Sequence, residues 1–344
     1  MLRRTNNKYF MISYIFLLYL NAHRSPSDAN CLGFLGKILT HEITATPACP
    51  LRILLIGGCG YIGSYLYLRL KQVGFDVQVV DQLKRGNPLG ISVLQVDYAD
   101  LDNDFLLNFD AVLWFAGHSS VGQSIEDPSG AVSNNCLNLF SFAKRLPEHT
   151  KLIYASSGSL YSTKFAPVAP ASESSLANIP SQNAYDISKF AFDYLANSFL
   201  SNFFALRMGT LAGYSPNLRS ELVFNAMNIA AVTTGRVHLK NCDSHRTILF
   251  LSDLWALVYK LLITKQQPGV YNAGSLSFKM GELAQGIAST WNAQVFYEGD
   301  SDTYSFLLDT TRMKAICGQD LAIADLSQRC REFIDQYKAT GSTC

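Results

Sequence analysis

A continuous apolar run at 53–56 opens an alternating pattern of strand-like and helix-like segments. Such a run is typical of a strand that is buried on both faces of a parallel sheet. Strands that alternate with helices of ten or more residues predict βαβ units, and therefore an α/β fold with a doubly wound parallel sheet. The predicted strands are 53–56, 77–80, 93–96, 111–115, 152–155 and 203–207, and the predicted helices are 62–73, 131–146 and 184–200.

The same pattern predicts an N-terminal extension followed by two domains. The alternation begins at residue 51, so residues 51–210 form the first predicted domain, to which 246–262 is expected to return, and residues 211–344 form a smaller C-terminal lobe. Residues 1–50 have no matching periodicity, and their apolar run at 9–20 is shorter than a membrane-spanning helix. Two interpretations stay open: an extension that is disordered or lies ahead of the true start, and a targeting or anchoring segment.

The composition of the chain limits the kinds of molecule that it is expected to bind. A chain of 344 residues can bury a large core, and its net charge of +1 with 16% charged residues gives no basic stripe for nucleic acid. The eight cysteines include no pair at metal-ligand spacing, so we expect no metal site. Scattered reduced thiols favour a cytoplasmic protein, and a membrane partner is not expected.

Three glycines follow the first strand at once and open the first helix. Gly57, Gly60 and Gly63 provide a tight turn, close backbone approach to a pyrophosphate and close packing of helix on strand. The intervening Tyr61 and Ile62 belong to the same turn, which places phosphates at the positive end of the helix. The turn therefore predicts a bound dinucleotide.

Asp81 ends the second strand about 18 residues after the last glycine. A carboxylate at this place accepts hydrogen bonds from both ribose hydroxyls and repels a 2′-phosphate, so NAD is expected rather than NADP. Lys84 and Arg85 lie close behind and act against that preference.

Polar and small residues follow the later strands. Asp97 is either an acceptor for the adenine amine or an aspartate that caps a turn. Ala116 and Gly117 are small enough for the backbone to pass against a cofactor. His118 is interpreted as a loop histidine rather than a metal ligand.

Tyr185 and Lys189 are separated by four residues on a predicted helix, which puts them on one face. An ammonium group beside a phenol favours the phenolate and lowers a pKa that is normally about 10, so Tyr185 becomes a usable base. Ser156 and Ser157 place hydroxyls at the end of the neighbouring strand.

These segments resemble the extended short-chain dehydrogenase/reductase family, and within it the UDP-galactose 4-epimerases and related NAD-dependent nucleotide-sugar epimerases and dehydratases. The resemblance covers residues 51 to about 318. Its ordered markers are Gly57-x-x-Gly60-x-x-Gly63, Asp81, Phe115-Ala116-Gly117, Val121-Gly122-Gln123-Ser124, Pro128 with Asn134-Asn135, Ser156-Ser157, Tyr185-x-x-x-Lys189, Leu206-Arg207, Arg246 with Asp253, and Val270-Tyr271-Asn272-Ala273-Gly274.

The resemblance implies a Rossmann domain with a C-terminal substrate-binding lobe, tightly bound NAD, and a homodimer formed through the helices at 131–146 and 184–200. It implies that Ser157 is the catalytic serine, Tyr185 the base, Lys189 the ligand of the nicotinamide ribose and Arg246 a contact to uridine diphosphate. The expected cofactor-binding residues are Gly57, Gly60, Tyr61, Ile62, Gly63, Asp81, Asp97, Ala116, Gly117, Asn135, Ser156, Tyr185 and Lys189, and the expected substrate-binding residues are Ser157, Tyr185, Thr210 and Arg246.

The chain also departs from that pattern. Ser119 stands where the galactose epimerases have a lysine, Trp114 where relatives often have histidine, and 208–210 where they have an asparagine. Gly158 and Ser159 replace the acidic pair of the sugar 4,6-dehydratases, so no acid is expected there to expel water.

The expected function is therefore NAD-dependent epimerisation of a nucleotide sugar, with C4 of a UDP-hexose as the first choice and a 4-keto intermediate. Two alternatives stay open: a nucleotide-sugar reductase or decarboxylase of the same family, and a catalytically silent dinucleotide-binding regulatory protein.

Overall fold

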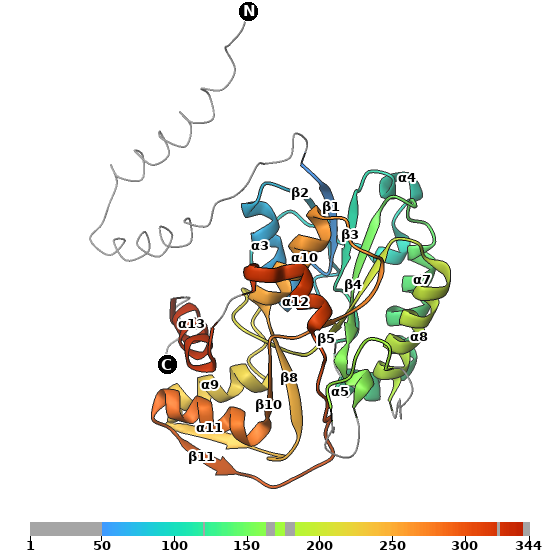
Figure 1. The fold of residues 1–344 in the computed structure, drawn as a ribbon. Coiled ribbons are helices and arrows are strands. Elements are labelled where there is room, and N and C mark those ends of the chain that lie inside the picture. The colour runs from blue at the N-terminus through green and yellow to red at the C-terminus, as the bar shows by residue number, and fades with distance from the viewer. Residues whose placement is uncertain (1–49, 120, 163–168, 176–182, 322–323, 340–344) are drawn as a thin grey trace, which may run out of the picture. The chain divides into compact units, whose positions relative to one another are not determined.

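The computed structural model describes residues 50–119, 121–162, 169–175, 183–321 and 324–339, so the interpretations of residues 1–49 lie outside the described residues. A parallel sheet of six strands forms the centre of the described chain (Figure 1). The strands lie in the order β2-β1-β3-β4-β5-β9, and every neighbouring pair is parallel. Their bounds are β1 (Arg52–Ile56), β2 (Asp76–Val80), β3 (Ala111–Trp114), β4 (Lys151–Ser157), β5 (Phe203–Met208) and β9 (Gly269–Ala273).

Successive side chains of β1 alternate between two apolar cores, because side chains of a strand point to opposite faces of the sheet. Ile53 and Leu55 belong to a core closed by α3 (Tyr61–Gln72), α10 (Leu251–Ile263) and α12 (Thr311–Cys317). Leu54 and Ile56 belong to a core closed by α7 (Asn138–Ala143) and α8 (Ala184–Phe199). Figure 1 shows the two groups of helices on opposite sides of the sheet. The predicted α/β fold with a doubly wound parallel sheet is confirmed.

Shorter elements connect these layers, and two of them differ from the prediction. The helix expected at 131–146 is divided into α6, the π-helical turn η2 and α7. The prediction of a strand at 93–96 is wrong, because Leu94 is the one residue of this segment that forms a β-bridge, and it does so with Val80. Leu94 is 37% exposed, and its segment lies beside β2, the last strand of the sheet, so it has a hydrogen-bonding strand on one side only. The connecting elements are η1 (Tyr98–Asp100), α4 (Asn103–Leu106), α5 (Val121–Glu126), α6 (Pro128–Val132), η2 (Ser133–Leu137), η3 (Gly158–Tyr161) and η4 (Gly318–Asp320).

A third apolar core lies among the elements of the later sequence. It packs α9 (Val223–Thr234), α11 (Met280–Trp291) and α13 (Leu326–Ala339) against β6 (Thr210–Ala212), β8 (His245–Phe250) and β10 (Leu276–Lys279). A two-stranded sheet of β7 (Arg236–Leu239) and β11 (Gln294–Tyr297) completes it. The chain returns to the central sheet through α10, β9 and α12. The division at residue 210 into two domains stays a prediction.

A buried ion pair fixes α8 against the central sheet. Arg207 Nε on β5 donates to Asp193 Oδ2 on α8 at 2.8 Å, and both side chains are 2% exposed. The hydroxyls of Tyr154 and Ser156 on β4 donate to the same carboxylate at 2.9 Å each. This polar cluster therefore joins β4, β5 and α8 directly beside the end of β4.

Two further observations concern the environment of the chain. No helix among the described residues is long and apolar enough to cross a bilayer. The cysteines that the structure describes, Cys59, Cys136, Cys242, Cys317 and Cys330, are free thiols.

Replacing Asp193 with Ala should destabilise the protein by about 3–5 kcal/mol, because it leaves the Arg207 guanidinium buried without a counter-ion. Urea unfolding measures the loss. The matched control is Asp76→Ala, which removes an exposed pair with Arg52 at 3.8 Å and should cost about 0–1 kcal/mol. Equal losses in the two variants would contradict this assignment.

Candidate active site

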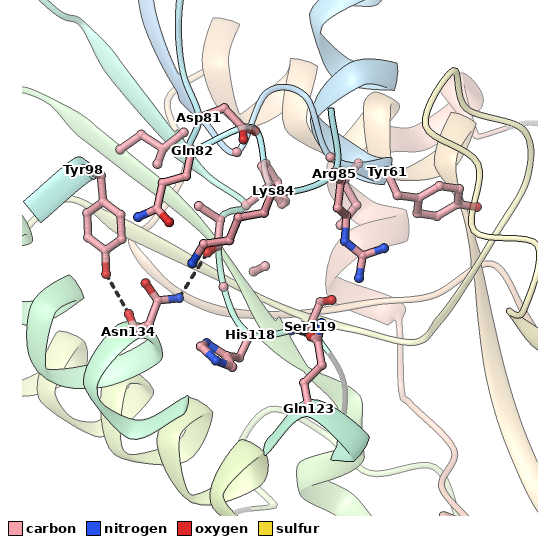
Figure 2. A pocket seen from close by; sticks show the side chains of 18 of the residues that line it. Tyr61, Asp81, Gln82, Lys84, Arg85, Tyr98, His118, Ser119, Gln123 and Asn134 are labelled. Carbon is pink, nitrogen blue, oxygen red and sulfur yellow. Dashed lines mark hydrogen bonds between the residues drawn. The ribbon is translucent and has the colours of Figure 1, made fainter. Parts of the chain in front are cut away.

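A cavity of about 590 Å³ opens at the carboxyl ends of the strands of the central sheet. The strand order reverses between β1 and β3, and parallel sheets bind ligands in the crevice at such a point. In Figure 2, Asp81, Lys84 and Arg85 face His118 and Gln123 across this cavity. The predicted residues that line it are Gly57, Gly60, Tyr61, Ile62, Asp81, Asp97, Ala116, Gly117, Ser156, Ser157, Tyr185 and Lys189.

The glycine turn at the start of α3 has no room for side chains at two positions. A Cβ at Gly57 would lie 2.7 Å from the carbonyl carbon of Phe115, and φ of Gly57 is +82°. A Cβ at Gly63 would lie 2.0 Å from the carbonyl oxygen of Gly57. The turn therefore packs backbone against backbone, and the N-terminus of α3 opens into the cavity beside Gly60 and Tyr61.

Asp81 holds this turn in place from the end of β2. Its carboxylate accepts the backbone N–H groups of Cys59 at 2.9 Å and of Leu83 at 2.7 Å. Each oxygen keeps a further lone pair that can accept a hydroxyl group. The cavity is also lined by Lys84 and Arg85, so two cations share it with the Asp81 carboxylate.

Asp97 lines the cavity and also caps the turn η1. Its carboxylate accepts the N–H of Ala99 at 2.9 Å and the amide of Gln82 at 2.5 Å. The capping role is therefore observed, and the contact to adenine stays a prediction.

The cavity is also lined by the three predicted catalytic residues, Ser157, Tyr185 and Lys189. Ser157 is the last residue of β4 and Tyr185 lies at the start of α8, and both line the cavity. One turn along α8, Lys189 donates to the carbonyl oxygen of Ala155 at 2.8 Å. Its Nζ lies 4.8 Å from the ring centroid of Trp114 and 5.9 Å from that of Tyr185.

The predicted electrostatic effect of Lys189 on Tyr185 is wrong in this structure. Burial raises the pKa of Tyr185 above its ordinary value, and the hydrogen bond from Ser157 and the charge of Arg219 oppose that rise. Burial also lowers the pKa of Lys189 to about 7. Loss of hydration is the largest cause of both shifts.

Two predicted cofactor residues do not line the cavity. Gly63 packs on the turn itself, as described above. Asn135 is fully buried, and its Nδ2 donates to the carbonyl oxygen of His118 at 3.2 Å and to Ser188 at 3.1 Å. Its Oδ1 has no hydrogen-bond partner within the described part of the chain. A contact of Asn135 with a cofactor stays a prediction.

A second cavity, of about 440 Å³, contains the two remaining predicted residues, Thr210 and Arg246. Arg246 donates to the carbonyl oxygen of His245 at 3.2 Å and to Thr303 at 2.7 Å, and forms no ion pair with any described residue. Burial lowers its pKa to about 10, so it remains a cation at neutral pH. The first cavity is lined by Met208, Gly209 and Leu211, and the second by Thr210, so the two cavities are neighbours.

Sequence reasoning missed several residues of this region. Arg219 lines the first cavity from the segment before α9, where no periodic pattern marks it. Ser159 and Asp186 form a hydrogen-bonded chain with Ser157, and neither of the two lines the cavity. The sequence offered one indication that Asp186 lies near the site, because it directly follows Tyr185.

Comparison with known proteins places these residues in a family context. The family model described as "NAD dependent epimerase/dehydratase family" matches residues 53–274. A UDP-glucose 4-epimerase from Halalkalibacterium halodurans is 31% identical over 180 residues, which are 48% of this chain and 53% of that protein. The chain thus spans about half the length of this curated relative.

Solved structures share the fold. A UDP-glucose 4-epimerase from Thermus thermophilus, in complex with NAD, has a TM-score of 0.68 at 22% identity and covers 85% of this chain and 100% of its own. DesIV, a dTDP-glucose 4,6-dehydratase from Streptomyces venezuelae solved with NAD, has a TM-score of 0.69 at 18% identity and covers 84% of this chain and 97% of its own.

The lowered pKa of Lys189 predicts a pH-dependent contribution to stability. Between about pH 7 and pH 10 the unfolded chain binds a proton at this lysine that the folded chain does not, so the free energy of unfolding rises with pH. Relative to Lys189→Met, the wild type should gain about 1–3 kcal/mol from pH 7 to pH 9 in urea unfolding. Lys260→Met is the control, because pairing with Asp320 raises the pKa of Lys260, and its difference from wild type should be flat over this range. A flat difference for both variants would contradict the pKa of Lys189.

Proposed function

Because the chain belongs to the NAD dependent epimerase/dehydratase family, we propose that it is an epimerase that inverts C4 of a UDP-linked hexose. NAD is the cofactor of this family. The observation that carries the proposal is that Ser157, Tyr185 and Lys189 line the same cavity as a glycine turn in which Gly57 and Gly63 leave no room for a Cβ. The sequence comparison with UDP-glucose 4-epimerases supports the reaction class.

The residues present fit NAD. The glycine turn offers backbone at the N-terminus of α3 where a Cβ at Gly57 or Gly63 would not fit, and such a turn suits a pyrophosphate. Asp81 lies where the ribose hydroxyls of the adenosine half would be held. Lys189 would hold the other ribose through its Nζ. When bound, NAD would supply reversible hydride transfer with the sugar.

In this mechanism the protein binds the sugar and moves its proton. Tyr185 Oη receives the proton of the sugar hydroxyl while C4 is oxidised, and returns it when the 4-keto intermediate is reduced on its other face. Ser157 hydrogen-bonds to the same region and supports the proton transfer. Tyr185 accepts this proton as the phenolate, a form that the charge of Arg219 favours.

The second cavity suits the nucleotide. Arg246 is a partly buried cation without a carboxylate partner among the described residues, and such a cation suits the binding of a diphosphate. Lys240 adds a second cation, whereas Glu221 and Glu298 limit the net positive charge. We therefore assign the diphosphate to Arg246 and the base to the region around His238.

The expected homodimer stays a prediction. Ile187, Tyr194 and Phe199 on α8 are 45%, 65% and 59% exposed, on one of the two helices that the resemblance implies for the contact.

The proposal is tested by incubating the protein with NAD and a panel of UDP-linked hexoses and pentoses, and by resolving the products. Interconversion of 4-epimers without net change in the cofactor is the expected result. Net reduction or loss of carbon dioxide would support the reductase or decarboxylase alternative, and no conversion of any sugar would favour the regulatory alternative.

Replacing Tyr185 with Phe removes one hydroxyl and leaves the ring to pack. If Tyr185 Oη carries the proton, turnover should fall by about 10² to 10⁴. The affinity for NAD should barely change, because Lys189 is the assigned ribose ligand. Turnover at the wild-type rate, with intact NAD binding, would refute the role of Tyr185.

Asp81 should make the protein prefer NAD to NADP. We expect NAD to bind at least about ten times more tightly than NADP, or about 1.4 kcal/mol, in titrations of cofactor-free protein. The control is the double variant Lys84→Met/Arg85→Met, which should weaken NADP further. Equal affinities in the wild type would mean that these cations capture the 2′-phosphate.

A further inference from the structure

The segment that follows β6 is hydrogen-bonded to the glycine turn. Tyr61 Oη donates to the carbonyl oxygen of Gly213 at 2.6 Å, and Ser215 Oγ donates to the carbonyl oxygen of Tyr61 at 2.6 Å. Figure 2 shows the side chain of Tyr61 pointing away from the other labelled side chains, which agrees with this contact. The 213–219 segment therefore begins against the N-terminus of α3.

Asn217 extends the contact to two loops of the cofactor cavity. Its Nδ2 donates to the carbonyl oxygen of Cys59 in the glycine turn at 2.7 Å and to that of Arg85 at 3.2 Å. The carboxylate of Asp81 accepts the N–H of the same Cys59. The glycine turn is thus held by the end of β2 and by the 213–219 segment together.

Asn225 on α9 fixes the backbone of Arg219 beside Tyr61. This amide is fully buried, and its Nδ2 donates to the carbonyl oxygen of Arg219 at 2.9 Å and to Tyr61 Oη at 3.3 Å. Its Oδ1 accepts the N–H of Gly213 at 3.0 Å. Arg219 therefore leaves the segment close to the start of α3, and it lines the first cavity.

The charge of Arg219 acts on two tyrosines that line this cavity. Burial raises the pKa of Tyr61, and the charge of Arg219 is among the causes that oppose this rise. The same charge opposes the rise in the pKa of Tyr185 that burial causes. Asp81 and Lys189 are the assigned partners of the two riboses, and the diphosphate of a dinucleotide lies between its riboses. Arg219 is therefore close to the middle of the expected course of the cofactor.

The guanidinium of Arg219 keeps hydrogen-bond donors for a ligand. Its Nε donates to Glu221 Oε1 at 2.7 Å, and the side chains of Arg219 and Glu221 are 14% and 60% exposed. The two terminal nitrogens form no hydrogen bond with any residue that the structure describes. A guanidinium fork matches the oxygens of a phosphate group. Glu221 thus orients a fork whose outer donors stay available.

We propose that Arg219 binds the diphosphate of NAD, as a cofactor ligand that comes from the segment between β6 and α9 rather than from the central sheet. The diphosphate would be bound by backbone N–H groups at the start of α3 and by the terminal nitrogens of Arg219. The proposal goes beyond the reaction proposed above, because it concerns how the cofactor is held and not which sugar reacts.

Arg219→Met tests the contact in titrations of the cofactor-free protein. NAD and ADP-ribose carry the diphosphate, and we expect both to bind about 10- to 100-fold more weakly than to the wild type, because a charge-assisted hydrogen-bond donor is lost. Adenosine lacks the diphosphate and should bind both proteins within about twofold. Calorimetry measures the first two ligands, and ligand-observed NMR measures adenosine. A merely structural role, in which Arg219 only shapes the turn, would weaken adenosine as well.

Two further variants serve as controls. Arg219→Lys keeps the cation without the fork and should recover part of the affinity for NAD. Arg52→Met removes an arginine at the opposite end of β1, which pairs with Asp76 at 3.8 Å, and should leave the affinity for NAD within about twofold of wild type. Urea unfolding without cofactor establishes that each variant is folded. Binding is the measurement rather than turnover, because the charge of Arg219 also acts on Tyr185.

Two results would overturn the proposal. One is an affinity of Arg219→Met for NAD within about twofold of wild type, and the other is an equal loss of affinity for adenosine and ADP-ribose. UDP tests the alternative that Arg219 serves the nucleotide sugar. In protein saturated with NAD, we expect UDP to bind Arg219→Met and the wild type within about twofold. Weaker binding of UDP with an unchanged affinity for NAD would assign Arg219 to the substrate and overturn its role at the cofactor.

Discussion

The site depends on one backbone contact, between the glycine turn after β1 and the end of β3. Because Gly57 lies against Phe115 with no room for a Cβ, the turn lies flat on the neighbouring strand and α3 starts beside the cavity. Parallel strands bring their carboxyl ends to the same edge. The residues that follow β2, β3 and β4 therefore meet this turn, and α8 adds Tyr185 and Lys189.

Loss of hydration controls the electrostatics of the inner cavity. Lys189 and Tyr185 have hydrogen-bond partners but no ion pair among the described residues, and burial shifts the pKa of each toward its neutral form. Behind them, Asp193 and Arg207 form a true ion pair that fixes β5 and α8. The charged cluster of Asp193 and Arg207 is thus separate from Lys189 and Tyr185, which line the cavity.

Local pattern in the sequence determined most of the central sheet and the outline of the cavity. The apolar run at 53–56 gives most of β1, helical spacing gives α3, and strand ends mark Asp81, Ala116 and Ser157, because all of these follow from the periodicity of neighbouring residues. The ordered motifs identified the family, and the family model later matched the same part of the chain.

The tertiary structure decided what depends on exposure and on distant partners. The 93–96 segment is not a strand because it lies at an open sheet edge, which its own sequence does not encode. The protonation of Tyr185 follows from burial rather than from its spacing to Lys189. Asp186 meets Ser159 and Tyr304 across 27 and 118 residues. Sequence by itself determined which chemical groups stand at the strand ends, and only folding decided which of them meet and how far they are buried, because hydration and long-range contact exist only in the packed molecule.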